Sequence, residues 1–136
     1  YRVGWLREAI MDLRSDLARA RGLGTAKEGT GHWWAQRVTA VALLPLGLWF
    51  VYSAVSWGGM DLAAFKAWLN GPGNLLLMVL FVGTLFYHMQ LGVQAVIEDY
   101  VHGEAAKITG LMINIFAAIF FGAASIIALF KVAFGG

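Results

Sequence analysis

The residues of this sequence that could carry chemistry gather between positions 86 and 101, inside a long apolar run. His88 stands near the middle of that run, and Asp99 and Tyr100 stand at its end. An imidazole in hydrocarbon needs a hydrogen-bond or metal partner, so His88 is either a metal ligand or a packed, hydrogen-bonded side chain. A phenol and a carboxylate at a membrane boundary could bind and protonate a quinone head group. They are also ordinary residues for the end of an interfacial helix.

Helical geometry places small residues beside His88. At about 100° per residue, Gly92 and Ala95 fall close to the His88 direction. They leave a slot that a flat macrocycle such as haem would fit, and small residues also let helices pack closely. The sequence has no cysteine, so any haem is held without thioether links. His32 and His102 lie too near the membrane surface to be a second mid-membrane ligand, so that ligand would come from another chain.

Asp99 follows His88 by eleven positions. Eleven helical steps return to within about 20° and climb roughly 16 Å along the axis. Asp99 therefore shares the His88 face, and it lies at the membrane interface beside Tyr100.

Three long apolar runs must position these residues. The chain has 136 residues, 60% hydrophobic and 13% charged, whereas soluble domains are about 45–50% apolar and about 25% charged. The runs cover about residues 33–57, 74–101 and 108–134, and each is long enough for the roughly 20 residues that a membrane-crossing helix needs. We therefore predict an all-α membrane protein with no soluble catalytic domain. A net charge of +2 makes nucleic acid an unexpected partner, and the lack of cysteine excludes iron–sulfur clusters in this chain.

An amphipathic N-terminal helix is expected before the first span. Apolar residues at helical spacing over positions 2–20 alternate with charged ones, which favours a helix on the membrane surface or against a partner subunit. The acids among them argue against a secretory signal or a transit peptide. Gly22, Gly24, Gly29 and Gly31 indicate a flexible connector. We thus divide the chain into a surface segment, 1–30, and a three-helix anchor domain, 31–136.

Smaller features complete the expected architecture. Pro45 should bend the first span, and Asp61 could cap a short interfacial helix that runs through Trp68. Residues 103–107 should form a short turn. Asn114 and Ser125 are expected to form helix-to-helix hydrogen bonds in the third span.

The basic residues predict the orientation. With three spans, eight of the ten Lys and Arg residues lie on the side of the N-terminus and the 101–107 turn. This bias places the N-terminus and Tyr100 in the cytoplasm, or in the matrix of a mitochondrion, where a soluble electron donor would dock.

Taken together, His88, Gly92 and the sequence Asp99-Tyr100-Val101 at the end of a second span resemble the hydrophobic membrane anchor (D) subunit of succinate dehydrogenase, respiratory complex II. The form of residues 99–104 is similar to that of alphaproteobacterial and mitochondrial members. Arg37, at the start of the first span in the sequence Arg-Val-Thr-Ala, strengthens the resemblance. It covers roughly residues 30–134 and leaves out the segment before Gly22.

The resemblance implies a role for each residue. His88 would be an axial ligand of a haem b shared with a second hydrophobic anchor subunit of the cytochrome b type, and Arg37 would lie near the haem propionates. Tyr100 and Asp99 would belong to the ubiquinone-binding site, with ubiquinone as substrate. Electrons would come from succinate through a flavoprotein subunit and an iron–sulfur subunit, so no succinate-oxidising chemistry is expected in this chain. The expected location is the bacterial or mitochondrial inner membrane, in contact with lipid.

Two alternatives remain at this point. The first is the related anchor of a fumarate reductase, which runs the reverse reaction with menaquinone; the pair Asp99 and Tyr100 favours ubiquinone reduction. The second is a non-redox small membrane protein, which would show neither haem absorbance nor quinone dependence.

Overall fold

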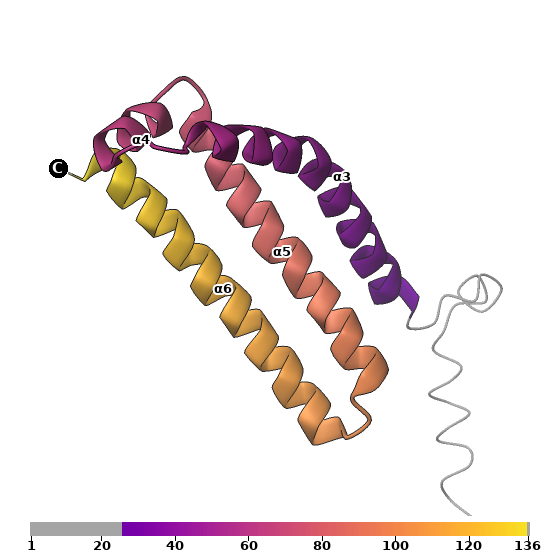
Figure 1. Cartoon of the computed structure of the whole chain (residues 1–136). Helices are drawn as coiled ribbons and strands as arrows, with labels where there is room; N and C mark the ends of the chain where they lie inside the picture. The colour runs from indigo at the N-terminus through magenta and orange to yellow at the C-terminus, as the bar shows by residue number, and fades with distance from the viewer. Residues whose placement is uncertain (1–25, 136) are drawn as a thin grey trace, which may run out of the picture. The chain divides into compact units, whose positions relative to one another are not determined.

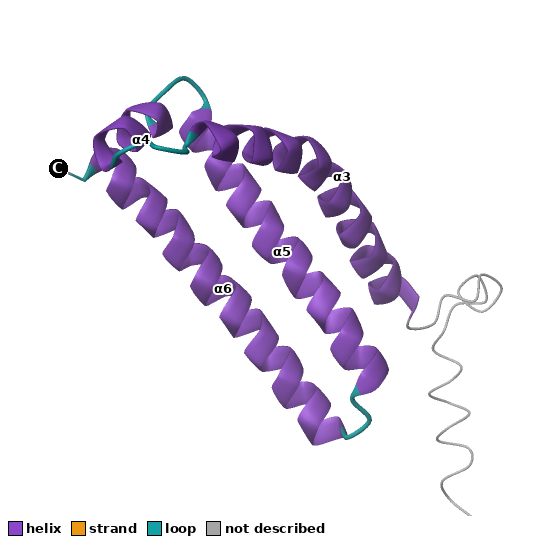
Figure 2. Cartoon of the chain, viewed as in Figure 1, coloured by secondary structure: helices purple, strands orange, loops and turns teal. Residues whose placement is uncertain are grey.

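The structure is a computed structural model that describes residues 26–135, and all its regular elements there are helices (Figure 2). They are α3 (Ala26–Ser56), α4 (Leu62–Leu69), α5 (Asn74–Tyr100) and α6 (Glu104–Phe134), drawn in Figure 1. Three segments are long and apolar enough to cross a membrane: Gly29–Ser56, Asn74–Tyr100 and Glu104–Phe134. The three predicted spans are thus confirmed, whereas the amphipathic helix predicted over 2–20 lies outside the described residues.

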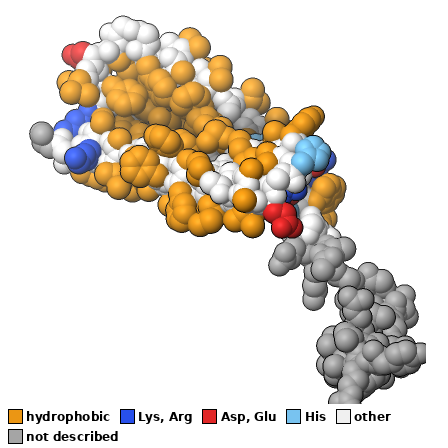
Figure 3. All heavy atoms as spheres, turned by 90° about the horizontal axis from the view of Figure 1, so that it is seen from below, with side chains coloured by type: hydrophobic (Ala, Val, Ile, Leu, Met, Phe, Trp, Pro, Cys, Tyr) orange, Lys and Arg blue, Asp and Glu red, His pale blue; other side chains and the backbone are white. Residues whose placement is uncertain are grey.

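The surface of these helices is apolar. On the face drawn in Figure 3, hydrophobic side chains cover most of the described part of the chain. Leu48, Val55 and Phe120 are examples, each more than 60% exposed. Such a surface would be unfavourable in water and is suited to lipid or to the helices of a partner subunit.

The chain divides into two compact units, residues 1–34 and 35–136. The described part of the first unit is helical, and the rings of Trp33 and Trp34 meet edge to face, 5.2 Å apart. Gly29 and Gly31, which were predicted to lie in a flexible connector, lie inside α3 instead, and Gly22 and Gly24 lie outside the described residues. An interior glycine costs a helix only about 1 kcal/mol relative to alanine. Extending a helix that is already nucleated adds a backbone hydrogen bond for each residue, which offsets this cost.

Within the second unit, α5 and α6 form an antiparallel hairpin. Two glycines of α6 face α5: a Cβ at Gly110 would lie 3.5 Å from Ile97, and a Cβ at Gly122 would lie 3.5 Å from Phe86, both ordinary van der Waals distances. The Asn114 side-chain amide donates to the backbone oxygen of Gln90 at 2.9 Å. This bond confirms the helix-to-helix role predicted for Asn114.

Two predictions about the third span are corrected. The connection is only residues 101–103, because α6 begins at Glu104, where the Lys107 N–H already donates to the Gly103 oxygen at 2.8 Å. Glu104 suits a helix start because its negative charge faces the positive end of the helix dipole. Ser125 makes no bond to another helix: its hydroxyl donates to the Phe121 oxygen of its own helix at 2.7 Å. A serine hydroxyl inside a helix often donates its hydrogen bond to a backbone oxygen one turn earlier.

The short helix α4 covers one end of the bundle, as expected. The Asp61 carboxylate accepts from the Ala64 N–H at 2.7 Å, which confirms the predicted cap. Asn70 then donates to the Ala133 oxygen of α6 at 2.9 Å. Leu69, Met78 and Ala133 form the buried core there, surrounded by aromatic side chains.

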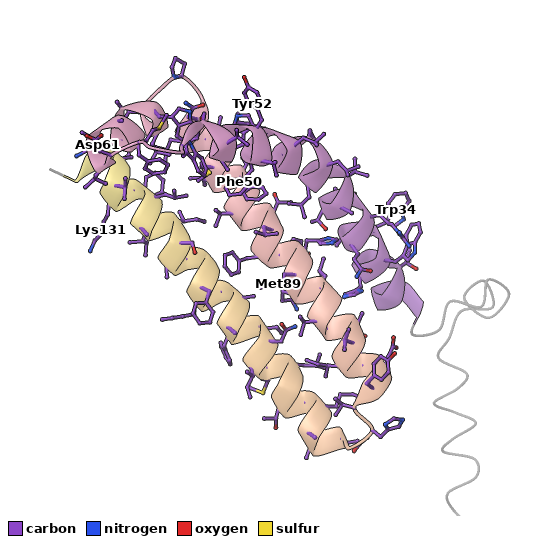
Figure 4. The ribbon with its side chains drawn as sticks, in the orientation of Figure 1. Trp34, Phe50, Tyr52, Asp61, Met89 and Lys131 are labelled. Carbon is purple, nitrogen blue, oxygen red and sulfur yellow. The ribbon has the colours of Figure 1, made fainter. Side chains whose placement is uncertain are left out.

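The helix α3 joins α5 through side chains. Within the second unit, no Cα atom of residues 35–56 lies within 8 Å of a Cα atom of α4, α5 or α6. Phe50 points toward α5 (Figure 4), where its ring stacks on Phe81 at 4.4 Å. The helix is curved in Figure 1, and Pro45, which removes one backbone hydrogen bond, lies inside it. The second contact between α3 and α5 involves His88.

Candidate functional site

His88 lies near the middle of α5, roughly 21 Å from the start of the helix and roughly 18 Å from its end. Its side chain is partly buried. Its Nδ1 atom lies 2.8 Å from the hydroxyl oxygen of Thr39 on α3. Its Nε2 atom makes no hydrogen bond to any described residue. The ring is thus held at one nitrogen, and the other is available to a ligand.

Thr39 is among the few buried polar residues of the described chain, with 8% of its surface exposed. Its hydroxyl also lies 2.7 Å from the Ala35 oxygen and 3.1 Å from the Gln36 oxygen, one turn earlier in α3. Thr39 was not predicted from the sequence as a site residue. The available signal was a hydroxyl inside an apolar span, two residues after Arg37, but its partner lies 49 positions away.

Gly92 lies one turn after His88 on the same helix. A Cβ placed there would meet no atom within 4 Å, whereas a Cβ at Gly122 would touch Phe86. Among the described residues Gly92 is therefore not a packing glycine, and it borders open space one turn from His88. The equatorial ligands of haem iron come from the macrocycle, so the protein need only supply axial donors. An anchored imidazole with a free nitrogen beside open space fits that requirement.

Tyr100 and Asp99 form a separate location at the end of α5. Tyr100 is 76% exposed, and Asp99 is also exposed. Neither side chain makes a hydrogen bond with the described residues. The backbone of α5 places Asp99 on the His88 side, within about 20° and roughly 16 Å away. The structure therefore does not bring the two predicted sites together; it places them at different depths on one helix.

Arg37 is exposed near the start of the first span. Two helical steps separate it from Thr39, so the two side chains leave α3 about 160° apart. Thr39 faces His88, and Arg37 therefore starts from the opposite side of the helix. Its assignment to the haem propionates stays a prediction that depends on the reach of the long side chain.

A polar ladder that the sequence analysis missed follows α5 toward its end. Gln90 donates to Gln94 at 3.1 Å, and Gln94 donates to Glu98 at 2.8 Å. The spacing of four residues was the available signal. Gln90 and Gln94 also line a cavity of about 550 Å³ between α5 and α6, and the ladder satisfies amides that would otherwise face hydrocarbon.

Comparison with known proteins adds independent information. The sequence model of the succinate dehydrogenase/fumarate reductase transmembrane subunit family matches residues 11–125. The match therefore begins before Gly22, whereas the resemblance predicted from the sequence covers roughly residues 30–134.

Individual relatives agree with the family match. The succinate dehydrogenase hydrophobic membrane anchor subunit of Rickettsia conorii is 30% identical over 122 residues, which are 89% of this chain and 97% of the relative. Its counterpart in Rickettsia bellii is 38% identical over 90 residues, 66% of this chain and 72% of the relative. The succinate dehydrogenase membrane anchor subunit of Reclinomonas americana is 32% identical over 90 residues, 64% of this chain and 75% of the relative. No solved structure matches.

Proposed function

The chain belongs to the succinate dehydrogenase/fumarate reductase transmembrane subunit family, and from this premise we propose that it is the membrane anchor subunit of a succinate:ubiquinone oxidoreductase. As a multi-pass membrane protein it would hold the flavoprotein and iron–sulfur subunits at the bilayer, together with a second hydrophobic anchor subunit. The names of its relatives support the anchor role, and its exposed apolar helix faces suit a partner within the membrane.

The redox part of the proposal depends on the hydrogen bonding of the two ring nitrogens of His88 and on the space beside the ring. Its Nδ1 atom is bonded to Thr39, its Nε2 atom has no hydrogen-bond partner among the described residues, and open space adjoins Gly92. His88 would hold the iron of a haem b through Nε2, and Arg37 would balance the charge of the propionates. The haem supplies one-electron redox chemistry when it is bound. Because this chain offers one mid-membrane imidazole, a second protein ligand to the haem would come from the partner anchor.

The second part of the proposal concerns quinone. Tyr100 would donate a hydrogen bond from its hydroxyl to a quinone carbonyl, and Asp99 would pair with a cation or assist proton delivery from the water side. Their exposure and lack of hydrogen-bond partners within the described chain leave both groups available. The apolar body of α5 next to them suits the isoprenoid tail.

Purification tests the anchor role directly. An affinity tag on this chain should capture a complex with covalently or tightly bound flavin and succinate-dependent quinone reductase activity. Capture of the chain with no flavin-containing partner, from membranes that retain the activity, would contradict the proposal. A fumarate reductase anchor would instead give a complex that reduces fumarate with a menaquinol analogue faster than it oxidises succinate.

The orientation gives a further prediction. The charge bias places the N-terminus in the cytoplasm or the matrix, and three spans then bring the end of α6 to the opposite side. A reporter fused after Gly136 should therefore be active on the periplasmic or intermembrane side, and one inserted after His102 should be cytoplasmic. If the two reporters lie on the opposite sides from those predicted, the orientation inferred from the charges is wrong. If both lie on the same side of the membrane, the number of spans is wrong.

A further inference from the structure

The hydroxyl of Thr39 lies within hydrogen-bonding distance of three atoms but carries one proton. The atoms are the backbone oxygens of Ala35 and Gln36, at 2.7 and 3.1 Å, and Nδ1 of His88, at 2.8 Å. A carbonyl oxygen can only accept, so a bond to either backbone oxygen uses the hydroxyl proton. The contact with His88 must then run in the other direction, into a lone pair of the hydroxyl oxygen.

This direction determines which nitrogen of His88 carries the proton. If the hydroxyl donates within α3, Nδ1 must be the N–H donor to Thr39. In a neutral imidazole one nitrogen is a donor and the other an acceptor, so Nε2 then holds the lone pair. In the opposite arrangement the Thr39 hydroxyl would donate its proton to Nδ1 of His88. The backbone oxygens of Ala35 and Gln36 would then lie close to Oγ1 with no hydrogen between them. The first arrangement satisfies every contact.

We propose that Thr39 is the positioning residue of His88: its hydroxyl, oriented by the carbonyls of α3, fixes the imidazole as the tautomer whose Nε2 is free to bind iron. This inference rests on the proposed haem ligation and extends it to a residue on another helix. Metal-binding histidines generally donate their second ring N–H to an acceptor that fixes the ring and raises its basicity. Among the described residues, the hydroxyl oxygen of Thr39 is the acceptor that lies within hydrogen-bonding distance of the second ring nitrogen of His88.

The surroundings make the contact more than incidental packing. The Cα atoms of residues 35–56 and those of α5 stay more than 8 Å apart, so a side-chain bond must span the gap between them. Thr39 is 8% exposed, so water has little access to replace the hydroxyl as a partner. Loss of the hydroxyl would leave the Nδ1–H without its acceptor and the ring free to turn or change tautomer.

The experiment uses the whole purified complex with Thr39→Val, which keeps the shape of the side chain and removes the hydroxyl. Thr39→Ser is the matched control, because it keeps the hydroxyl and removes only a methyl group. The measurements are haem content per flavin, haem loss to excess apomyoglobin, and the midpoint potential of the haem. For Thr39→Val we expect haem binding weaker by about 10- to 100-fold, the usual effect of losing such a partner. We also expect a higher midpoint potential, because a less basic imidazole stabilises ferric iron less.

The serine control should restore both haem retention and potential. An unchanged potential and rate of haem loss in Thr39→Val would overturn the positioning role. Equal losses in the valine and serine variants would also overturn it, since the methyl group and not the hydroxyl would then matter. His88→Leu, measured alongside, separates the proposed haem ligation by His88 from the positioning role of Thr39. An unchanged haem spectrum in His88→Leu would refute the ligation itself, and the role of Thr39 with it.

Discussion

Replacing His88 with leucine is expected to abolish the low-spin b-type haem spectrum of the complex or convert it to another spin state. Leucine fills a similar volume in the apolar span but has no donor atom. Without the imidazole of His88, the haem would be held at most by a ligand from the partner subunit, and it would be bound more weakly. The measurement is a reduced-minus-oxidised spectrum of the purified complex, normalised to flavin.

A second histidine provides the control. His102 lies exposed in the connection between α5 and α6, and His102→Leu should leave the haem spectrum unchanged. An unaltered low-spin spectrum in His88→Leu would mean that His88 is not an axial ligand and that its bond to Thr39 serves packing alone. Partial survival of quinone reduction would not contradict the assignment, because electrons need not pass through the haem to reach quinone.

The positions of the membrane spans were predictable because length and hydropathy decide them. The ends of the helices were not. Hydropathy locates the segment within the hydrocarbon, but a helix continues through the interface as long as its backbone bonds can form. Hence α6 begins at Glu104 and not at 108, and α3 already includes Gly29 and Gly31. The cap at Asp61 was predictable because capping depends on residues that are adjacent in the sequence.

For the candidate site, the positions of the residues along one helix were predictable, but their contacts with another helix were not. The depth of His88 and the shared face of Asp99 follow from the position and rotation of one helix. The partner of His88 does not, because Thr39 lies on a different helix, and the sequence does not say which faces of α3 and α5 meet. The same limit explains Ser125, whose bond within its own helix satisfied a group that was expected to reach a neighbour.

Replacing Tyr100 with phenylalanine is expected to lower succinate:quinone reductase activity at least roughly tenfold. The change keeps the ring and deletes only the hydroxyl. Losing one hydrogen bond to a ligand costs about 0.5–1.5 kcal/mol, and more when a buried partner is left unsatisfied. A loss of about 1.4 kcal/mol in the transition state corresponds to tenfold in rate. Quinone takes up two protons with its two electrons, so the hydroxyl contributes most while the carbonyl oxygen gains charge.

Two assays on the same preparation separate this role from failed assembly. Succinate oxidation by a water-soluble artificial acceptor should persist in Tyr100→Phe, because the soluble subunits would carry that chemistry. Flavin content checks assembly. Tyr52 offers a matched control: it is 80% exposed on α3 and points away from the other helices in Figure 4. Tyr52→Phe should retain both activities.

The exposure of Tyr100 makes the outcome informative. Its hydroxyl makes no hydrogen bond with the described residues, so its removal breaks no bond that holds these helices together. A selective loss of quinone reduction would therefore point to a ligand bond and not to a structural one. Wild-type rates and quinone affinity in Tyr100→Phe would refute the assigned role. Equal losses in both assays would instead indicate that Tyr100 supports the docking of the soluble subunits, whose electrons both assays require.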